Sequence, residues 1–176
     1  QHIASLNQAH VTLLDFSAYN ATGVAGVRSF GPNATFGQDM EPEYVAVSKN
    51  SLKAWVTLQE NNAMAEVNLA TKRIVRVWPL GFKDHNVAGN GMDASDRSGS
   101  VLINTWPVKG MYQPDAAASY NYLGQPFIVT ANEGDVREYD TFVENARVKD
   151  VLLDSLSFPN RSSLRSDAQI GRLNIT

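Results

Sequence analysis

Cysteine is absent from the 176 residues, and histidine is scarce. Without thiols the chain can form no disulfide, no thiolate metal site and no cysteine nucleophile, although this absence does not identify a cellular compartment. The three histidines, His2, His10 and His85, lie far apart in the sequence. A zinc site takes three or four ligands, mostly nitrogen or sulfur. The sequence therefore excludes the common cysteine and zinc chemistries.

Long apolar runs and an excess of basic charge are missing as well. No run of about eighteen apolar residues is present, so the sequence predicts no membrane-spanning helix. The formal net charge of -3 leaves no basic footprint, which argues against nucleic acid as a partner. A Gly-x-Ser-x-Gly elbow is absent, and Gly89-Asn90-Gly91 does not match a phosphate-binding P-loop. These absences exclude several familiar hydrolase and nucleotide-binding sites.

The clearest pattern in the chain is a set of four short apolar segments between Glu41 and Gly81. Polar turn residues separate the segments, and the last one alternates polar and apolar side chains. Four strands within about 40 residues is the size of one β-propeller blade. The pattern predicts a single antiparallel sheet, in chain order, from Tyr44–Val47, Lys53–Leu58, Ala63–Leu69 and Arg73–Trp78.

A second copy of this pattern begins near residue 111. Glu41-Pro42-Glu43-Tyr44 is echoed by Gln113-Pro114-Asp115-Ala116, and Val56–Asn61 is echoed by Val129–Gly134. Between the copies, residues 82–110 carry Gly, Asn, Asp and Ser at loop density, which predicts a long inter-blade insertion. We therefore expect an all-β fold, a partial β-propeller of about two blades plus flanking strands. Residues 1–176 form part of one propeller domain, with a blade at about 41–81 and the next from about 111.

Two shorter segments and the three tryptophans carry further expectations. Apolar residues between Tyr139 and Lys149 permit one short helix. The run Arg137–Asp140 is most simply a solvated surface turn. The three tryptophans fit core and inter-blade packing better than a ligand platform.

Blade topology predicts that acidic residues gather on one face. The innermost strand of a blade starts at the face where the second strand ends, because neighbouring strands are antiparallel. The insertion emerges at the same face and brings further acids. Clustered carboxylates repel one another unless a metal cation or an arginine neutralises their charge. Carboxylate oxygens are suitable ligands for Ca²⁺ or Mg²⁺. The candidate metal ligands are Glu41, Glu43, Glu60, Asp84, His85, Asp93, Asp96, Asp115, Glu133 and Asp135.

Salt bridges or backbone capping could also account for these acids. Salt bridges to Arg97 or Arg137 would neutralise the carboxylates without a metal ion. Propeller loops are also polar in general, with acids capping backbone groups. The segment Asp93–Gly99 faintly resembles a calcium loop, but its spacing does not fit an EF-hand.

Four N-glycosylation sequons are present, at Asn20, Asn33, Asn160 and Asn174. An Asn-x-Ser/Thr sequon marks a surface loop in a secreted protein. Asn20 and Asn33 lie beside glycine-containing or Gly-Pro turns, so we expect exposed loops that carry glycan. Asn174 is the weakest candidate, because it lies in a strand-like run.

Several long motifs resemble one protein family. They are Asp39–Val45, Val56–Ala63, Leu80–His85, Asp93–Arg97, Met111–Asp115, Thr130–Asp135 and Ala146–Asp150. Together they are similar to the choice-of-anchor I family, whose animal members are called mesenchyme-specific cell surface glycoproteins. The chain departs from the common pattern at Ser98, where many relatives have an acid, and this weakens the resemblance of that segment to a metal-binding loop.

The resemblance implies a β-propeller that is secreted, on the cell surface or in extracellular matrix. Family members are longer, so we expect an internal fragment whose other contacts include the remaining blades. The first functional hypothesis is a non-enzymatic extracellular glycoprotein with matrix or cell-surface partners, and with Ca²⁺ on its acidic face. The alternative is a metal-dependent phosphoesterase, since bacterial relatives carry an alkaline-phosphatase-like label. That enzyme would need Arg97, Lys83 or Arg137 facing an open cation position.

Overall fold

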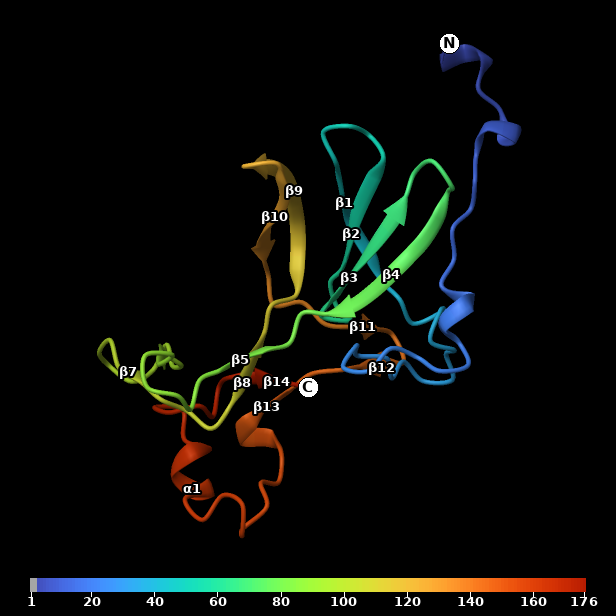
Figure 1. Cartoon of the computed structure of the whole chain (residues 1–176). Helices are drawn as coiled ribbons and strands as arrows, with labels where there is room; N and C mark the ends of the chain where they lie inside the picture. Colours follow the sequence, from blue (N-terminus) through green and yellow to red (C-terminus); the bar gives the residue numbers. More distant parts are fainter. Residues whose placement is uncertain (1–2) are drawn as a thin grey trace. The chain divides into compact units, whose positions relative to one another are not determined.

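The computed structural model describes residues 3–176, so His2 lies outside the described residues (Figure 1). Strands and turns dominate, and the chain divides into two compact units. Unit 1 takes the residues up to Gly81 together with Tyr112–Asp135. Unit 2 takes Phe82–Met111 and Val136–Thr176. The chain is thus all-β, as the strand pattern predicts.

Unit 1 contains the predicted four-stranded sheet. Its strands pair in the order β1-β2-β3-β4, and each neighbouring pair is antiparallel. Short turns join the strands, and Asn62 and Lys72 adopt left-handed backbone angles within two of them. The prediction of one blade-like sheet in chain order is therefore confirmed. The strands are β1 (Pro42–Val47), β2 (Lys53–Leu58), β3 (Ala63–Asn68) and β4 (Arg73–Pro79).

One face of this sheet is covered by the segment that precedes it. Phe16, Phe36 and Met40 join a buried apolar cluster with sheet residues that include Leu58 and Val77. Burying a side chain of this size contributes about 2–3 kcal/mol, so the cluster holds the otherwise irregular segment against the sheet. Three short 3₁₀ turns lie before or within that segment, at Ile3–Ser5, Gln8–His10 and Ser17–Tyr19.

The second repeat forms a long hairpin of β9 (Pro114–Tyr122) and β10 (Gln125–Asn132). The Ser119 hydroxyl donates to the Val47 carbonyl at 2.6 Å, so β9 packs beside β1 at positions 72 residues apart (Figure 1). The echo of Glu41–Tyr44 by Gln113–Ala116 has the same offset of 72 residues. Within residues 3–176 the β9–β10 sheet has two strands.

Two consecutive buried amides, Asn61 and Asn62, connect these pieces at the β2–β3 turn. Both side chains are essentially inaccessible to solvent. The Asn61 side chain accepts from the Glu41 amide at 2.9 Å and donates to the carbonyls of Arg28 and Asp39, each at 2.8 Å. It therefore fixes the entry to β1.

The Asn62 side chain does the same for the second repeat. Its oxygen accepts from the amides of Tyr112 and Gln113 at 2.9 and 3.1 Å, directly before β9. Its amide group donates to the Gly81 carbonyl at 2.7 Å, just after β4. Backbone groups that would otherwise be buried without partners are satisfied in this way.

Unit 2 is built from four small strand pairs around a separate core. Trp106, Val148, Leu164 and Ile170 are buried together, and the Trp106 indole donates to the Met92 carbonyl at 2.9 Å. The pairs are β5 (Phe82–Asp84) with β8 (Lys109–Met111), β6 (Met92–Asp93) with β7 (Ile103–Asn104), β11 (Glu138–Tyr139) with β12 (Phe142–Val143), and β13 (Ala146–Arg147) with β14 (Asn174–Ile175). A 3₁₀ turn at Val148–Asp150 and α1 (Arg161–Leu164) complete the unit.

The insertion at residues 82–110 is therefore more than a loop. Four of its segments are strands, and Trp106 anchors a core shared with residues beyond 136. The high content of glycine, asparagine and serine in residues 82–110 correctly indicated that this region contains many turns. It did not reveal that the turns close around a buried tryptophan from the same segment.

Two weaker expectations are wrong. The segment Tyr139–Lys149 forms no α-helix: its residues contribute to the β11–β12 hairpin and to β13, and only a 3₁₀ turn at Val148–Asp150 begins at its end. Arg137 is not solvated, since it is 2% exposed, although Glu138–Asp140 are exposed. Of the tryptophans, Trp55 and Trp106 are buried, and Trp78 is half-buried beneath the Arg76 guanidinium.

Among the described residues, no helix has the length and apolar character needed to cross a bilayer.

The amide pair predicts a large stability effect from a small substitution. Asn61→Ala leaves one amide and two carbonyls inside unit 1 without these partners, and each such group costs about 1–3 kcal/mol. We expect the free energy of unfolding to fall by at least about 3 kcal/mol. Urea unfolding monitored by circular dichroism measures this change.

The matched control is Asn50→Ala, which removes an exposed turn amide that binds Ser48 and Leu52. We expect a loss of about 1 kcal/mol or less, because water replaces those bonds. Equal losses for the two variants would contradict a special role for the buried amide.

Candidate functional site

Six of the predicted acids lie at one end of unit 1. Glu41 precedes β1, and Glu60 follows β2, whose last residue Leu58 is opposite Pro42. Glu133 follows β10, whose last residue is opposite Pro114, and the Gln59 amide group donates to the Glu133 carbonyl at 3.5 Å. The hairpin ends of the two repeats therefore meet. This acidic end comprises Glu41, Glu43, Glu60, Asp115, Glu133 and Asp135.

Hydrogen bonds to backbone groups hold the segments of the acidic end together. The Glu133 amide donates to the Gln113 carbonyl at 3.0 Å, and the buried Gln113 side chain donates to the Asp135 carbonyl. Arg28 also reaches this end, where its guanidinium donates to the Glu60 carbonyl at 2.7 Å. Sequence reasoning named other arginines as counter-charges and missed this one.

Convergence of the chain does not produce a metal cage among the described side chains. In residues 3–176, no three His, Cys, Asp or Glu side chains are placed to hold one metal ion. Glu43, Glu133 and Asp135 are exposed, while Glu41 and Asp115 are half-buried.

Asp84 and His85 help to shape a tight turn in unit 2. The His85 Nδ1 lies 2.7 Å from the Asn90 carbonyl, and the Asn90 side chain donates to the Asp84 carbonyl at 2.9 Å. The Asp84 carboxylate accepts from the Asn86 amide. A side chain at Gly110 would come within 2.8 Å of His85 Nε2, so glycine allows the ring to lie against that strand.

Asp96 forms a two-pronged ion pair with Arg172. The guanidinium donates to the two carboxylate oxygens at 2.6 and 3.1 Å. This hydrogen-bonded partner lowers the pKa of Asp96 below its ordinary value. Asp93, three residues earlier, is exposed in β6 and forms no ion pair within residues 3–176.

Asp167 and two basic residues near it form a second group of ion pairs that involves the insertion. Lys149 lies 3.1 Å from the Asp167 carboxylate, and Arg97 lies 3.8 Å from it. The hydrogen bond from Lys149 is the main cause of the lowered pKa of Asp167. The Ser95 hydroxyl donates to the Asp167 carbonyl. The insertion is thereby tied to the last part of the chain.

Arg137 and Glu144 form a buried ion pair that the sequence did not predict. The Nη1–Oε2 distance is 3.3 Å, and each side chain is 1% exposed. The same carboxylate oxygen accepts from the Arg137 backbone amide at 3.0 Å. Removing one member of a buried pair leaves an uncompensated charge, which makes this pair a structural constraint. The only sequence signal was an Arg and a Glu seven positions apart in one segment.

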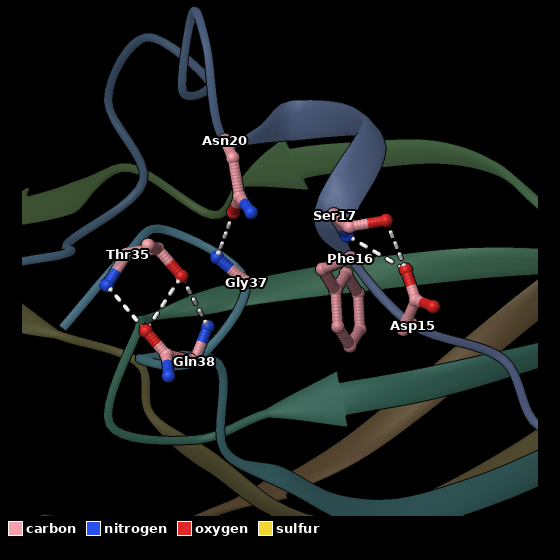
Figure 2. A pocket seen from close by; sticks show the side chains of 7 residues that line it. All are labelled: Asp15, Phe16, Ser17, Asn20, Thr35, Gly37 and Gln38. Atoms are coloured by element: carbon pink, nitrogen blue, oxygen red, sulfur yellow. Dashed lines mark hydrogen bonds between the residues drawn. The ribbon is translucent and has the colours of Figure 1, made fainter.

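A small hollow of about 170 Å³ lies beside the first two sequons of unit 1 (Figure 2). Phe16 lines it, and its polar groups bind one another: Asn20 accepts from the Gly37 amide at 2.7 Å, and Thr35 donates to Gln38 at 2.9 Å. Typical small-molecule pockets have about 300–1,000 Å³. The hollow is therefore too small, and too internally satisfied, to serve as a ligand pocket.

All four sequon asparagines are exposed. Asn33 occupies a turn with φ of 61°, and Asn160 precedes α1. Asn20 uses its side-chain oxygen for the bond to Gly37, and a glycan attaches through the nitrogen instead. Exposure is the geometric requirement for glycan attachment.

The Asp96 and Asp167 ion pairs predict acid sensitivity of unit 2. Both pKa values are lowered from 3.8, so these pairs stabilise the folded unit at pH values above 3.8. The contribution is lost as the pH falls from 3.8 through the lowered values. We expect Asp96→Asn to weaken this pH dependence. The Trp106 indole NMR resonance, followed during acid titration, reports the folded state of unit 2.

Asp93→Asn is the matched control for this titration, because it removes an exposed carboxylate from the same insertion without breaking an ion pair. We expect its acid transition to follow that of the parent. An Asp96→Asn transition that superimposes on the parent would contradict the assignment.

Comparison with curated proteins and with solved structures gives no significant match. The choice-of-anchor I domain model matches residues 2–176. This range includes the four-stranded sheet, the second hairpin, the insertion and the strands of unit 2. Because the match extends over nearly the whole sequence, the chain belongs to the choice-of-anchor I domain family.

Proposed function

We propose that this chain is a non-enzymatic part of an extracellular or cell-surface glycoprotein, with a binding or matrix role. Family membership over residues 2–176 is the observation that carries the proposal. The exposure of all four sequon asparagines supports it, since a secreted protein with these sites presents them to the glycosylation machinery. The remaining blades of the propeller and matrix or cell-surface molecules are its proposed partners.

Within the family, we place the chain with the animal members, the mesenchyme-specific cell surface glycoproteins. Four sequons in 176 residues support this placement, because sequons are read in eukaryotic secretion.

The non-enzymatic role is supported by what the reactive side chains do in the structure. His85 contacts the Asn90 carbonyl, and Asp96 binds Arg172. Of the cations that a phosphoesterase would need, Arg137 is buried against Glu144. These groups hold local structure, and a catalytic group must instead reach a substrate.

Calcium binding at the acidic end stays a prediction, supported by charge alone. Six carboxylates lie at this end, while the described side chains do not gather three ligands around one point.

Glycosylation is the direct test of the proposal. The chain, secreted from animal cells behind a heterologous signal sequence, is expected to carry glycan at Asn20 and Asn33. Each of the substitutions Asn20→Gln and Asn33→Gln should remove one glycan, measured by mass spectrometry with and without peptide-N-glycosidase. Asn174→Gln is expected to change the mass least, because Asn174 lies in β14. A secreted chain without glycan would contradict the glycoprotein assignment.

Calcium and phosphoesterase activity are tested together. Calorimetric titration with Ca²⁺ compares the parent with the Glu60→Gln/Glu133→Gln double variant, whose acidic end has two fewer charges. We expect weaker binding in the variant and no hydrolysis of p-nitrophenyl phosphate with Ca²⁺, Mg²⁺ or Zn²⁺. Equal Ca²⁺ binding in both proteins would remove the metal prediction. Metal-dependent hydrolysis that the double variant loses would favour the enzyme.

A further inference from the structure

Charge is distributed unevenly along unit 1. The six acids of the acidic end lie where β1 and β9 begin. The opposite end of the four-stranded sheet, formed by the β1–β2 and β3–β4 turns and by β4, carries cations instead. We call this second surface the basic end. It comprises Lys49, Lys53, Lys72, Arg73 and Arg76.

The two turns of the basic end lie side by side. The Leu69 amide donates to the Leu52 carbonyl at 2.9 Å, which joins the β3–β4 turn to the start of β2. Lys53 pairs across the sheet with Asn68, and Asn68 pairs with Arg73. Neighbouring strands are about 4.8 Å apart, so the Lys53 and Arg73 backbones are about 10 Å apart.

Few acids neutralise these cations. Glu66 is the carboxylate of this part of the sheet, and it binds Lys53 at 2.6 Å. Lys49, Lys72 and Arg73 are exposed, and within residues 3–176 none of them has an ion pair. Arg76 is exposed and lies over the Trp78 ring at 5.0 Å, and it is opposite Glu66 across the β3–β4 pair. Five cations and one carboxylate give the basic end a strong local charge in a chain whose net charge is negative.

The cations are spread along one strand and the neighbouring turns and do not surround a single point. Arg73 and Arg76 lie in β4, which is the edge strand of the sheet, and Lys72 precedes them in the β3–β4 turn. At about 3.3 Å per residue, Arg73 and Arg76 are about 10 Å apart along the strand. Lys49 lies in the neighbouring turn. Exposed cations spread over neighbouring turns and one strand suit an extended polyanion, which can contact several of them at once.

We infer that the basic end binds a sulfated polysaccharide, an extended polyanion of extracellular surfaces. Arginine suits this ligand, because its planar guanidinium binds the oxygens of a tetrahedral anion through two hydrogen bonds. The choice of a polysaccharide rests on the proposed extracellular role. The basic end itself rests only on the positions and pairing of its five cations.

Heparin chromatography and isothermal titration with defined heparin oligosaccharides test the inference. We expect the parent chain to bind at about 0.15 M salt, and binding to weaken as salt rises, because bound counterions are released from the polymer. The charge-reversal variant Lys72→Glu/Arg73→Glu should lose about tenfold or more in affinity, since two exposed contacts become repulsive. Far-ultraviolet circular dichroism confirms that this variant retains the parent fold.

The matched control is Lys83→Glu/Lys109→Glu, which makes the same change in net charge in unit 2. We expect its heparin affinity to stay within about twofold of the parent. Absence of heparin binding by the parent, or an equal loss in both variants, would overturn the inference. Binding to phosphatidylserine vesicles but not to heparin would overturn it in favour of a membrane surface. A negative heparin result leaves the glycosylation test of the proposed function unaffected.

Discussion

Unit 1 depends on one constraint, the burial of two adjacent asparagine side chains at the β2–β3 turn. Asn61 and Asn62 each form three hydrogen bonds to backbone groups, and both are almost fully buried. A primary amide suits this position because it donates and accepts through groups only a few ångströms apart. The Asn61 side chain binds the backbone directly before β1, and the Asn62 side chain binds the backbone directly before β9. The two repeats are therefore joined through one turn.

This junction explains why carboxylates gather at the same end. The segments that the amides hold also carry Glu41, Glu60 and Asp115, so backbone satisfaction brings acidic residues near one another. In unit 2, Asp96, Asp167 and Glu144 bind basic side chains. The acids of unit 1 therefore lie close together because the segments that carry them are held at one turn by backbone hydrogen bonds.

Much of unit 1 could be predicted, because its signals are local. Strand spacing and turn residues describe neighbours in sequence, and the four strands appear within one or two residues of the predicted bounds. The partners of the acids could not be predicted in the same way. Asp96 binds Arg172, which is 76 residues away, and Asp167 binds Lys149 and Arg97 from two different segments. Arg97 and Arg137 were expected at the acidic face, but their carboxylate partners are Asp167 and Glu144.

The sequence by itself determined that this is an all-β chain with a repeated hairpin, that it contains no cysteine, and that its motifs resemble one family. The first two conclusions follow from strand periodicity and composition, and the third from the motifs themselves, none of which depends on how distant segments meet. Only the tertiary structure decided that Arg137 is buried, that Trp106 gives the insertion a core, and that Asn61 and Asn62 join the repeats. In each case a polar or aromatic side chain finds its partner through a fold that brings remote backbone groups together, and no local pattern records that partner.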